Sequence, residues 1–199
     1  MRIVSGMAGG IRLEAPDGRG VRPTGDRVKE SLFGSLGDIC GWTVVDLFSG
    51  SGALGLEALS RGAKTVHFFE RDRRTVRYIE KNLTRVRTAM NGQEGETEVH
   101  TLPAERAPRR LPSLCGSVDL VLADPPYHPR TGEYGSEKLL EDADFAAWAN
   151  GALLVLEHET GTDLPWLPKS PWKVLKVKRF GTQCLSFARQ RVQPEQTET

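Results

Sequence analysis

Residues 44–55 read VVDLFSGSGALG and combine the signals of a strand, a turn and a helix. The stretch begins as an apolar run, the pattern of a strand buried on both faces, and passes through a glycine-rich turn into a helical pattern. The glycines at 50, 52 and 55 have G-x-G-x-x-G spacing, which lets the backbone turn tightly and approach a ligand over the helix N-terminus. A P-loop is excluded because no Gly-Lys-Ser/Thr sequence follows. The stretch therefore predicts a strand, a ligand-binding turn and a helix.

The alternation of strands and helices continues on both sides of this stretch. Such a pattern predicts a parallel sheet covered on both faces, and right-handed crossovers make it a doubly wound α/β domain. The last two strands are joined by a short loop, so we expect the sheet to end in an antiparallel hairpin. The expected strands are 42–48, 64–70, 98–102, 118–124, 151–157, 172–177 and 182–188, with helices at 26–36, 53–60 and 136–149 and a long basic helix capped by Asp72.

Length and composition indicate one globular domain. At 199 residues the chain is about one domain long. We expect an N-terminal β-hairpin and loop extension over residues 1–25, with strands at 2–5 and 11–14, a main domain over 26–189, and a disordered tail over 190–199. The chain contains no apolar stretch of ~18 residues and no apolar segment typical of a secretory signal near its start. A membrane span or an exported protein is therefore not expected.

The cysteines and the distribution of charge indicate the cellular compartment and the kind of binding partner. Three widely spaced cysteines suit neither a zinc site nor a closed disulfide set, so we expect a cytoplasmic protein with these thiols buried. The net charge is only +1, but seven basic residues lie between Arg71 and Arg87 and seven more between Leu164 and Gln193. Local clusters of this kind suit a polyanion such as nucleic acid, and a solvated helix face is the alternative.

Two acidic residues suggest what the glycine turn binds. Glu70 ends the next apolar run, where its carboxylate can accept both hydroxyl protons of a ribose. Asp46 lies at the end of the first apolar strand, and a carboxylate there suits a ligand with an ammonium group, such as the methionine end of S-adenosylmethionine. The alternative is a glycine turn that serves only helix packing, with Glu70 at the surface.

Asp124-Pro125-Pro126-Tyr127 directly follows the apolar run 118–123. In an open α/β sheet, ligands lie outside the carboxyl ends of the strands. The two prolines fix φ and supply no N–H, so their carbonyls can accept from an exocyclic amine. The Asp124 carboxylate and the Pro125 carbonyl would hold the two amine hydrogens and aim the nitrogen lone pair, while Tyr127 stacks on the planar group. The alternative is a rigid turn that ends a strand.

The motifs together resemble the amino-directed S-adenosylmethionine methyltransferases, which carry Asp/Asn-Pro-Pro-Tyr/Phe after the fourth strand. More narrowly, the chain resembles the bacterial 16S rRNA guanine-N2 methyltransferase family (RsmD type). The resemblance runs from Met1 to about Phe187. It is carried by residues 1–3 (MRI), 22–24 (RPT), 26–28 (DRV), Glu30, 46–48 (DLF), 50–55 (GSGALG), 57–63 (EALSRGA) and 124–127 (DPPY).

This resemblance implies a fold, a reaction and a set of site residues. The fold is a Rossmann-like class I methyltransferase with a mostly parallel seven-stranded sheet. The reaction is N2-methylation of a guanine in 16S rRNA, with S-adenosylmethionine as cofactor. We further expect a monomer that acts on a small-subunit particle without a metal or a membrane. The implied cofactor-binding residues are Thr24, Arg27, Asp46, Phe48, Ser49, Gly50, Gly52, Glu70, Arg71, Ala104 and Asp124. Catalysis falls to Asp124, Pro125, Pro126 and Tyr127. We expect RNA binding by Arg22 and, from the basic cluster, by Arg73, Arg74 and Arg77.

The chain departs from the family pattern at two places. Leu102-Pro103-Ala104 stands where Gly-Asp-Ala is frequent, so the carboxylate for the adenine amino group is absent and Glu105 or a backbone group is expected to replace it. Met7, Gly9 and Ile11 stand where Lys or Arg is common. Part of the RNA contact is therefore expected on the helix that spans 71–87.

Four alternatives remain from the sequence. A DNA adenine-N6 methyltransferase shares Asp-Pro-Pro-Tyr but normally carries an added region for base readout. A protein-glutamine methyltransferase favours Asn at the first position of that motif. A non-catalytic nucleic-acid-binding module would explain the basic clusters and leave residues 124–127 without a role. A dehydrogenase would leave both Asp46 and the prolines without one.

Overall fold

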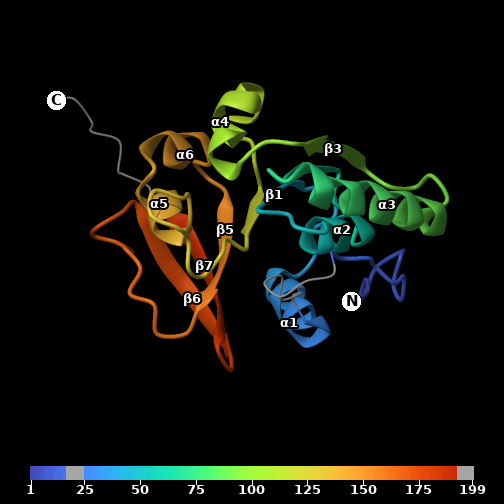
Figure 1. Ribbon diagram of the computed structural model, residues 1–199, viewed down its shortest axis with the longest axis horizontal. Helices are drawn as coiled ribbons and strands as arrows, with labels where there is room; N and C mark the ends of the chain where they lie inside the picture. Colours follow the sequence, from blue (N-terminus) through green and yellow to red (C-terminus); the bar gives the residue numbers. More distant parts are fainter. Residues whose placement is uncertain (17–24, 192–199) are drawn as a thin grey trace.

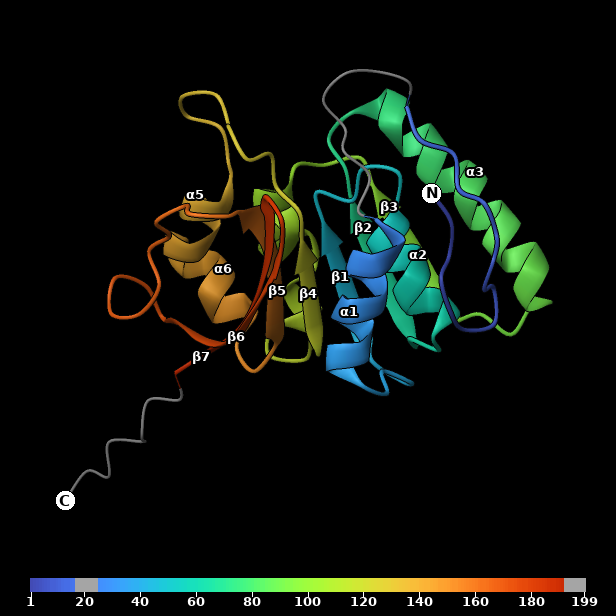
Figure 2. The ribbon, with the colours of Figure 1, turned by 90° about the horizontal axis from the view of Figure 1, so that it is seen from below.

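The computed structural model describes residues 1–16 and 25–191 of the chain. Its strands are β1 (Thr43–Leu47), β2 (Thr65–Phe69), β3 (Glu96–His100), β4 (Leu120–Ala123), β5 (Leu153–Glu159), β6 (Trp172–Phe180) and β7 (Gln183–Gln190). They form one seven-stranded sheet in the order β3-β2-β1-β4-β5-β7-β6, and Figures 1 and 2 show it from two directions. Strands β1 to β5 run parallel, and β7 runs antiparallel to both of its neighbours. The predicted doubly wound α/β fold, with its closing antiparallel hairpin, is therefore confirmed.

Helices cover both faces of the sheet. The helices are α1 (Asp26–Leu36), α2 (Ala53–Ser60), α3 (Arg73–Met90), α4 (Ala107–Arg110), α5 (Ser136–Glu141) and α6 (Ala143–Trp148), with short 3-10 helices η1 (Ala104–Arg106) and η2 (Pro112–Leu114). Figure 2 shows α1, α2 and α3 on one side of the strands and α5 and α6 on the other. Neighbouring side chains of one strand enter different cores: Val44 packs with α2, and Val45 and Leu47 pack with α6. This two-sided burial explains the continuous apolar runs.

Several predicted boundaries hold and others shift for local reasons. Helix α2 has the expected bounds, and the Asp72 carboxylate caps α3 by accepting the Arg74 N–H at 3.0 Å. Gly25, not Asp26, is the N-cap of α1, and the Asp26 carboxylate pairs instead with Arg2 at 2.8 Å. Strand β3 begins two residues earlier than expected, because Glu96 is its first partner in the register with β2.

The helix expected over 136–149 is two helices. Asp142 ends α5 and caps α6, since its carboxylate accepts the Phe145 N–H at 2.9 Å. An Asp side chain that bonds to the backbone in this way competes with helix continuation. The same carboxylate also accepts the Tyr134 hydroxyl at 2.8 Å, so this break fixes the loop before α5.

The N-terminal β-hairpin forms with one bridge, between Arg2 and Arg12, rather than with two strands. The chain does fold back, since the Ile3 N–H donates to the Ile11 carbonyl at 2.8 Å. The Glu57 carboxylate of α2 accepts hydrogen bonds from the N–H groups of Val4 and Ser5 at 2.7 and 3.0 Å. These two N–H groups therefore do not pair with a neighbouring strand. The segment packs through Ile3, which is fully buried in the core of α1 and α2.

Glu57 also centres a buried ion-pair cluster. Its side chain and that of Lys29 are both 0% exposed, with 3.6 Å between Lys29 Nζ and Glu57 Oε2, and Arg61 Nη2 lies 2.9 Å from Oε1. Burial lowers the pKa of Lys29. Because the N–H groups of the N-terminal segment complete the cluster, it joins that segment to α1 and α2.

The cysteines are free, and the expected burial is right for Cys184 and wrong for Cys40 and Cys115, which lie in exposed loops outside the cores. Residues 192–199 of the expected tail lie outside the described residues, and Gln190 is the last residue of β7. Within the described ranges, every helix is too short or too polar to cross a membrane.

Candidate active site

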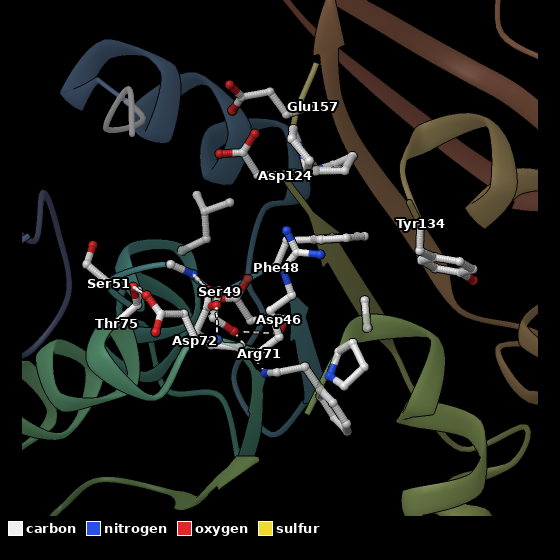
Figure 3. A pocket seen from close by; sticks show the side chains of 18 of the residues that line it. Asp46, Phe48, Ser49, Ser51, Arg71, Asp72, Thr75, Asp124, Tyr134 and Glu157 are labelled. Carbon is white, nitrogen blue, oxygen red and sulfur yellow. Dashed lines mark hydrogen bonds between the residues drawn. The ribbon is translucent and has the colours of Figure 1, made fainter. Parts of the chain in front are cut away.

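A cavity of about 660 Å³ opens at the carboxyl ends of β1, β2, β4 and β5 (Figure 3). This is the switch point of the sheet, because the chain leaves β1 toward β2 and β3 on one side and continues through β4 and β5 on the other. Open α/β sheets bind ligands at such a crevice. Its lining therefore comes from the turns that follow the strands, which include residues 48–51, 70–72 and 124–128.

The glycine turn after β1 is sharply bent. Phe48 has φ +59°, and Gly50 and Gly52 have φ +54° and +83°. A left-handed backbone is uncommon for a bulky side chain, so Phe48 marks a constrained turn beside the cavity. Gly55 is required for packing instead: a Cβ there would lie 2.3 Å from a ring carbon of Phe68 and 2.9 Å from Asp46 Oδ2. The glycines thus divide between turn geometry and the contact of α2 with the sheet.

Asp46 is a buried carboxyl group at the bottom of the cavity. It is 1% exposed, and its Oδ2 accepts the Gly55 N–H at 2.9 Å. Burial raises its pKa to about 7; the Gly55 bond opposes this shift and the nearby Glu70 adds to it. A cation that reached the cavity would favour the ionised form of this group.

Glu70 joins the end of β2 to the glycine turn. Its Oε2 accepts the Gly50 N–H at 3.0 Å, and its Oε1 accepts the Asp72 N–H at 2.8 Å. Burial raises the pKa of the carboxyl, and the two backbone bonds oppose that shift. Both bonds fix the carboxylate at the cavity wall, where each oxygen retains acceptor capacity for a further donor.

The Asp124–Tyr127 segment forms the opposite end of the cavity. The Tyr127 hydroxyl donates to Glu157 Oε1 at 3.0 Å, and Gln183 Nε2 donates to the same oxygen at 2.7 Å. Burial raises the pKa of Tyr127, and the Glu157 charge adds to this effect, so the phenol stays neutral. Figure 3 shows the carboxylates of Asp124 and Glu157 next to each other at this end.

The side wall comes from the long loop between β4 and α5. Arg71 pairs with Glu133 of this loop, which brings the end of β2 against it. The rings of Phe48 and Tyr134 stack with centroids 6.3 Å apart and an interplanar angle of 21°. The two rings line the cavity and give it an apolar surface suited to a planar group.

The structure brings most predicted site residues together. The predicted residues that line the cavity are Asp46, Phe48, Ser49, Gly50, Glu70, Arg71, Ala104, Asp124, Pro125, Pro126 and Tyr127, and Glu105 joins them. Gly52 lies behind the wall, since a Cβ there would meet Ile79 and Leu56 at 3.3 Å. Arg27 is exposed on α1 and is not among the described lining residues. Thr24 and Arg22 lie outside the described residues.

The three arginines expected to bind RNA, Arg73, Arg74 and Arg77, are exposed on α3 outside the cavity. Helix α3 begins one residue after the lining residue Asp72, so its first turn borders the cavity mouth. The side chains stand near the site without entering it.

Sequence reasoning missed some lining residues. Glu157 is the last residue of the strand expected at 151–157, and an acid at a strand end is the same signal that identified Asp46, Glu70 and Asp124. Glu133 and Tyr134 belong to an irregular loop, whose sequence has no periodicity that could have placed them in the lining.

A second cluster of titratable side chains lies between β2, β3 and α4. His67 Nδ1 is 3.4 Å from His100 Nε2, and the Glu98 carboxylate is 3.6 Å from each ring. Burial lowers the pKa of both histidines, that of His100 to about 4. Arg110 Nη2 holds the Glu98 carboxylate at 2.5 Å, and this positive charge opposes a bound cation. The arrangement supports a neutral, hydrogen-bonded histidine pair.

The similarity to known proteins extends over all residues of the site. The family model described as Conserved hypothetical protein 95 matches residues 1–189. Ribosomal RNA small subunit methyltransferase D of Haemophilus influenzae is 35% identical over 182 residues, 91% of this chain and 89% of that protein. The protein of the same name from Escherichia coli (strain K12) is 34% identical over 182 residues, 91% of this chain and 85% of that protein. The solved structure of Escherichia coli yhhF has a TM-score of 0.72 at 32% identity, covering 97% of this chain and 99% of that one.

Proposed function

The chain belongs to the family described as Conserved hypothetical protein 95, and from this premise we propose that it methylates the N2 amine of a guanine in 16S rRNA, with S-adenosylmethionine as cofactor. The single observation that carries the proposal is the cavity itself, in which a glycine turn with Asp46 and Glu70 faces Asp124–Tyr127 across one space. A glycine turn alone would suit many nucleotide ligands. An Asp-Pro-Pro-Tyr segment opposite it adds a site for an amine.

The cavity fits the cofactor. Its volume of about 660 Å³ lies inside the ~300 to 1,000 Å³ usual for small-molecule sites. Asp46 would hold the ammonium group and Glu70 the ribose hydroxyls, while Phe48 and Ala104 offer apolar contacts to the adenine. Glu105 lines the same region and is our candidate for the adenine amine. When bound, the cofactor supplies a methyl group already activated by the sulfonium charge.

The residues of this chain act mainly by positioning. The Asp124 carboxylate and the Pro125 carbonyl accept the two hydrogens of the guanine amine and direct its lone pair toward the cofactor side of the cavity. Tyr127, held by Glu157 and Gln183, provides a flat ring for the base to stack on. Asp124 need not be a strong base, because the proton can leave once the nitrogen carries a positive charge. Alignment of two reactants in this way supplies most of the acceleration.

The target guanine must leave its stack to enter the cavity, and the RNA backbone must then lie at the mouth. Arg73 and Arg74 are exposed directly after the lining residue Asp72, and Arg77 is exposed one turn further along α3. These side chains would neutralise phosphates of the RNA. We infer that the protein acts in the cytoplasm, as a monomer and without a metal, and that it recognises the RNA within a small-subunit particle.

The deciding experiment is transfer of labelled methyl from S-adenosylmethionine to four substrates: unmodified small subunits, free 16S rRNA, duplex DNA and total protein. Nucleoside digestion and chromatography then identify the product. We expect label in N2-methylguanosine from subunits, with less from free rRNA. Label in N6-methyladenine would instead assign the DNA or adenine class, and cofactor binding without transfer to any substrate would overturn the proposed substrate.

A further inference from the structure

Glu157 is a buried carboxylate next to the proposed position of the target base. It is 3% exposed, lines the cavity and follows directly after Leu156, which pairs with Ala123 of β4. Asp124 follows Ala123 at the end of β4, so the register places it beside Glu157 of β5, and Figure 3 shows the two acids next to each other. A buried carboxylate costs stability unless it makes strong interactions. A second acid beside Asp124 therefore requires a reason.

Two donors from different elements fix the orientation of Glu157. Tyr127 from the segment after β4 and Gln183 from β7 both donate to Oε1, at 3.0 and 2.7 Å. A carboxylate has about four acceptor positions, so a ligand donor can join these two bonds. Both bonds hold Glu157 in the role of an acceptor, because Tyr127 and Gln183 supply the hydrogens.

The chemistry of the bases determines which ligand suits two adjacent carboxylates. Adenine, cytosine and guanine all carry an exocyclic amine, but guanine alone has a ring N–H beside it, at N1. Adenine and cytosine present a ring nitrogen lone pair at the corresponding position. A carboxylate accepts a hydrogen bond from guanine N1–H and repels the lone pair of the other two bases, so it both favours one base and opposes its competitors.

We propose that Glu157 selects guanine by accepting its N1–H, while Asp124 and Pro125 hold the N2 amine. This inference rests on the proposed function and adds the residue that determines its base specificity. Enzymes that act on extruded bases commonly identify them through the Watson–Crick edge. The alternative is that Glu157 only holds the Tyr127 ring in place.

The test uses 2-aminopurine, which carries the same N2 amine as guanine and has a lone pair at N1. Small subunits are reconstituted with either base at the methylated position, once that position is located, and kcat/KM is measured for each. We expect the wild-type protein to prefer guanine by on the order of 100-fold, since a buried acceptor left without its donor costs about as much as a charge-assisted hydrogen bond. Equal rates on the two bases in the wild type would overturn the inference without recourse to any variant.

The Glu157→Gln variant distinguishes recognition of guanine N1–H from mere support of the Tyr127 ring. The amide can still accept from Tyr127 and Gln183 and can donate to N1 of 2-aminopurine, so the preference for guanine should fall at least tenfold. If Glu157 only supports Tyr127, both substrates lose rate together and the ratio stays at the wild-type value, which would overturn the inference.

Glu159→Gln is the matched control, two residues further along β5, where the carboxylate pairs with exposed His128 at 3.5 Å. Its base preference should equal that of the wild type. Cofactor affinity by calorimetry, expected within about twofold of the wild type for both variants, shows that the cavity is intact. Failure of the proposed function would appear separately, as absence of N2-methylguanosine with the wild-type protein on guanine substrate.

Discussion

Asp46 should make cofactor affinity depend on pH, because burial raises its pKa to about 7. An ammonium group bound at this carboxyl requires the ionised form, so the proton must leave before the pair can form. At pH 5 the carboxyl is two pH units below that pKa and roughly 1% ionised. The affinity should then be about 100-fold weaker than that of the fully ionised protein, or ~2.7 kcal/mol.

Isothermal titration calorimetry from pH 5 to pH 8 measures this directly. The wild-type protein should gain about tenfold in affinity per pH unit below the pKa, whereas Asp46→Asn should bind weakly and without this slope. Methylthioadenosine, which lacks the amino-acid end of the cofactor, serves as the control ligand and should show no slope with either protein. A flat wild-type profile, or a slope that persists in Asp46→Asn, would refute the reasoning.

The same shift acts on the stability of the ligand-free protein. The pKa of folded Asp46 lies above the ordinary value of 3.8, so the folded state retains a proton that the unfolded state releases between these values. Its contribution is fully present below pH 3.8 and is lost as the pH rises through 7. Ligand-free Asp46→Asn should therefore melt above the wild type at pH 8 and close to it at pH 4, by differential scanning fluorimetry.

Three further predictions concern packing, acid stability and RNA. Gly55→Ala should lower the midpoint of thermal unfolding, because the new Cβ would lie 2.3 Å from a ring carbon of Phe68 and overpacking costs ~1 to 3 kcal/mol. The control is Gly34→Ala in α1, which should raise the midpoint because a Cβ there meets nothing within 4 Å. Equal midpoints for the two variants would contradict this prediction. The pKa of folded His100 is about 4 against an ordinary 6.5, so the unfolded state takes up the proton first as the pH falls. The free energy of unfolding measured by urea titration should therefore fall by about 3 kcal/mol over that interval. The loss should shrink in His100→Phe, and an identical loss there would assign it to other groups. Arg73→Ala and Arg74→Ala should each lower the salt slope of rRNA binding by about one; filter binding with unchanged slopes would place the RNA elsewhere.

The sheet could be predicted because its sequence signals are local. The runs around Val45, Val66 and Val121 are apolar on both faces, and residues 50–55 connect the first of them to a helix. Periodicity of this kind reports burial and does not report where an element stops. The break at Asp142 depends on a side chain that bonds to a backbone N–H three residues later, and a continuous helical pattern hides it.

The acid residues of the site could be predicted wherever they follow a strand. Asp46, Glu70 and Asp124 are found at the carboxyl ends of expected strands, and Glu157 ends the expected strand 151–157, although the structure extends β5 to Glu159. The side wall of the cavity depends on the ion pair between Glu133 and Arg71. These two residues lie far apart in the chain, so the spacing of residues in the sequence could not predict the contact. The single bridge of the N-terminal hairpin likewise depends on Glu57, whose carboxylate accepts N–H groups more than fifty residues away.

The position of β7 in the sheet determines which half of the cavity can form first while the chain is synthesised. It follows β6 in the chain but lies between β5 and β6 in the sheet, and it supplies Gln183 to Glu157. The glycine turn and Glu70 are synthesised within the first 72 residues, so the half that would bind the cofactor can pack early. The acceptor half is completed only after β7 has emerged and entered the sheet, since domains are synthesised N-terminal end first. A nascent chain halted before Gln183 would thus present an open sheet edge at β5 and a Glu157 carboxylate without the Gln183 hydrogen bond.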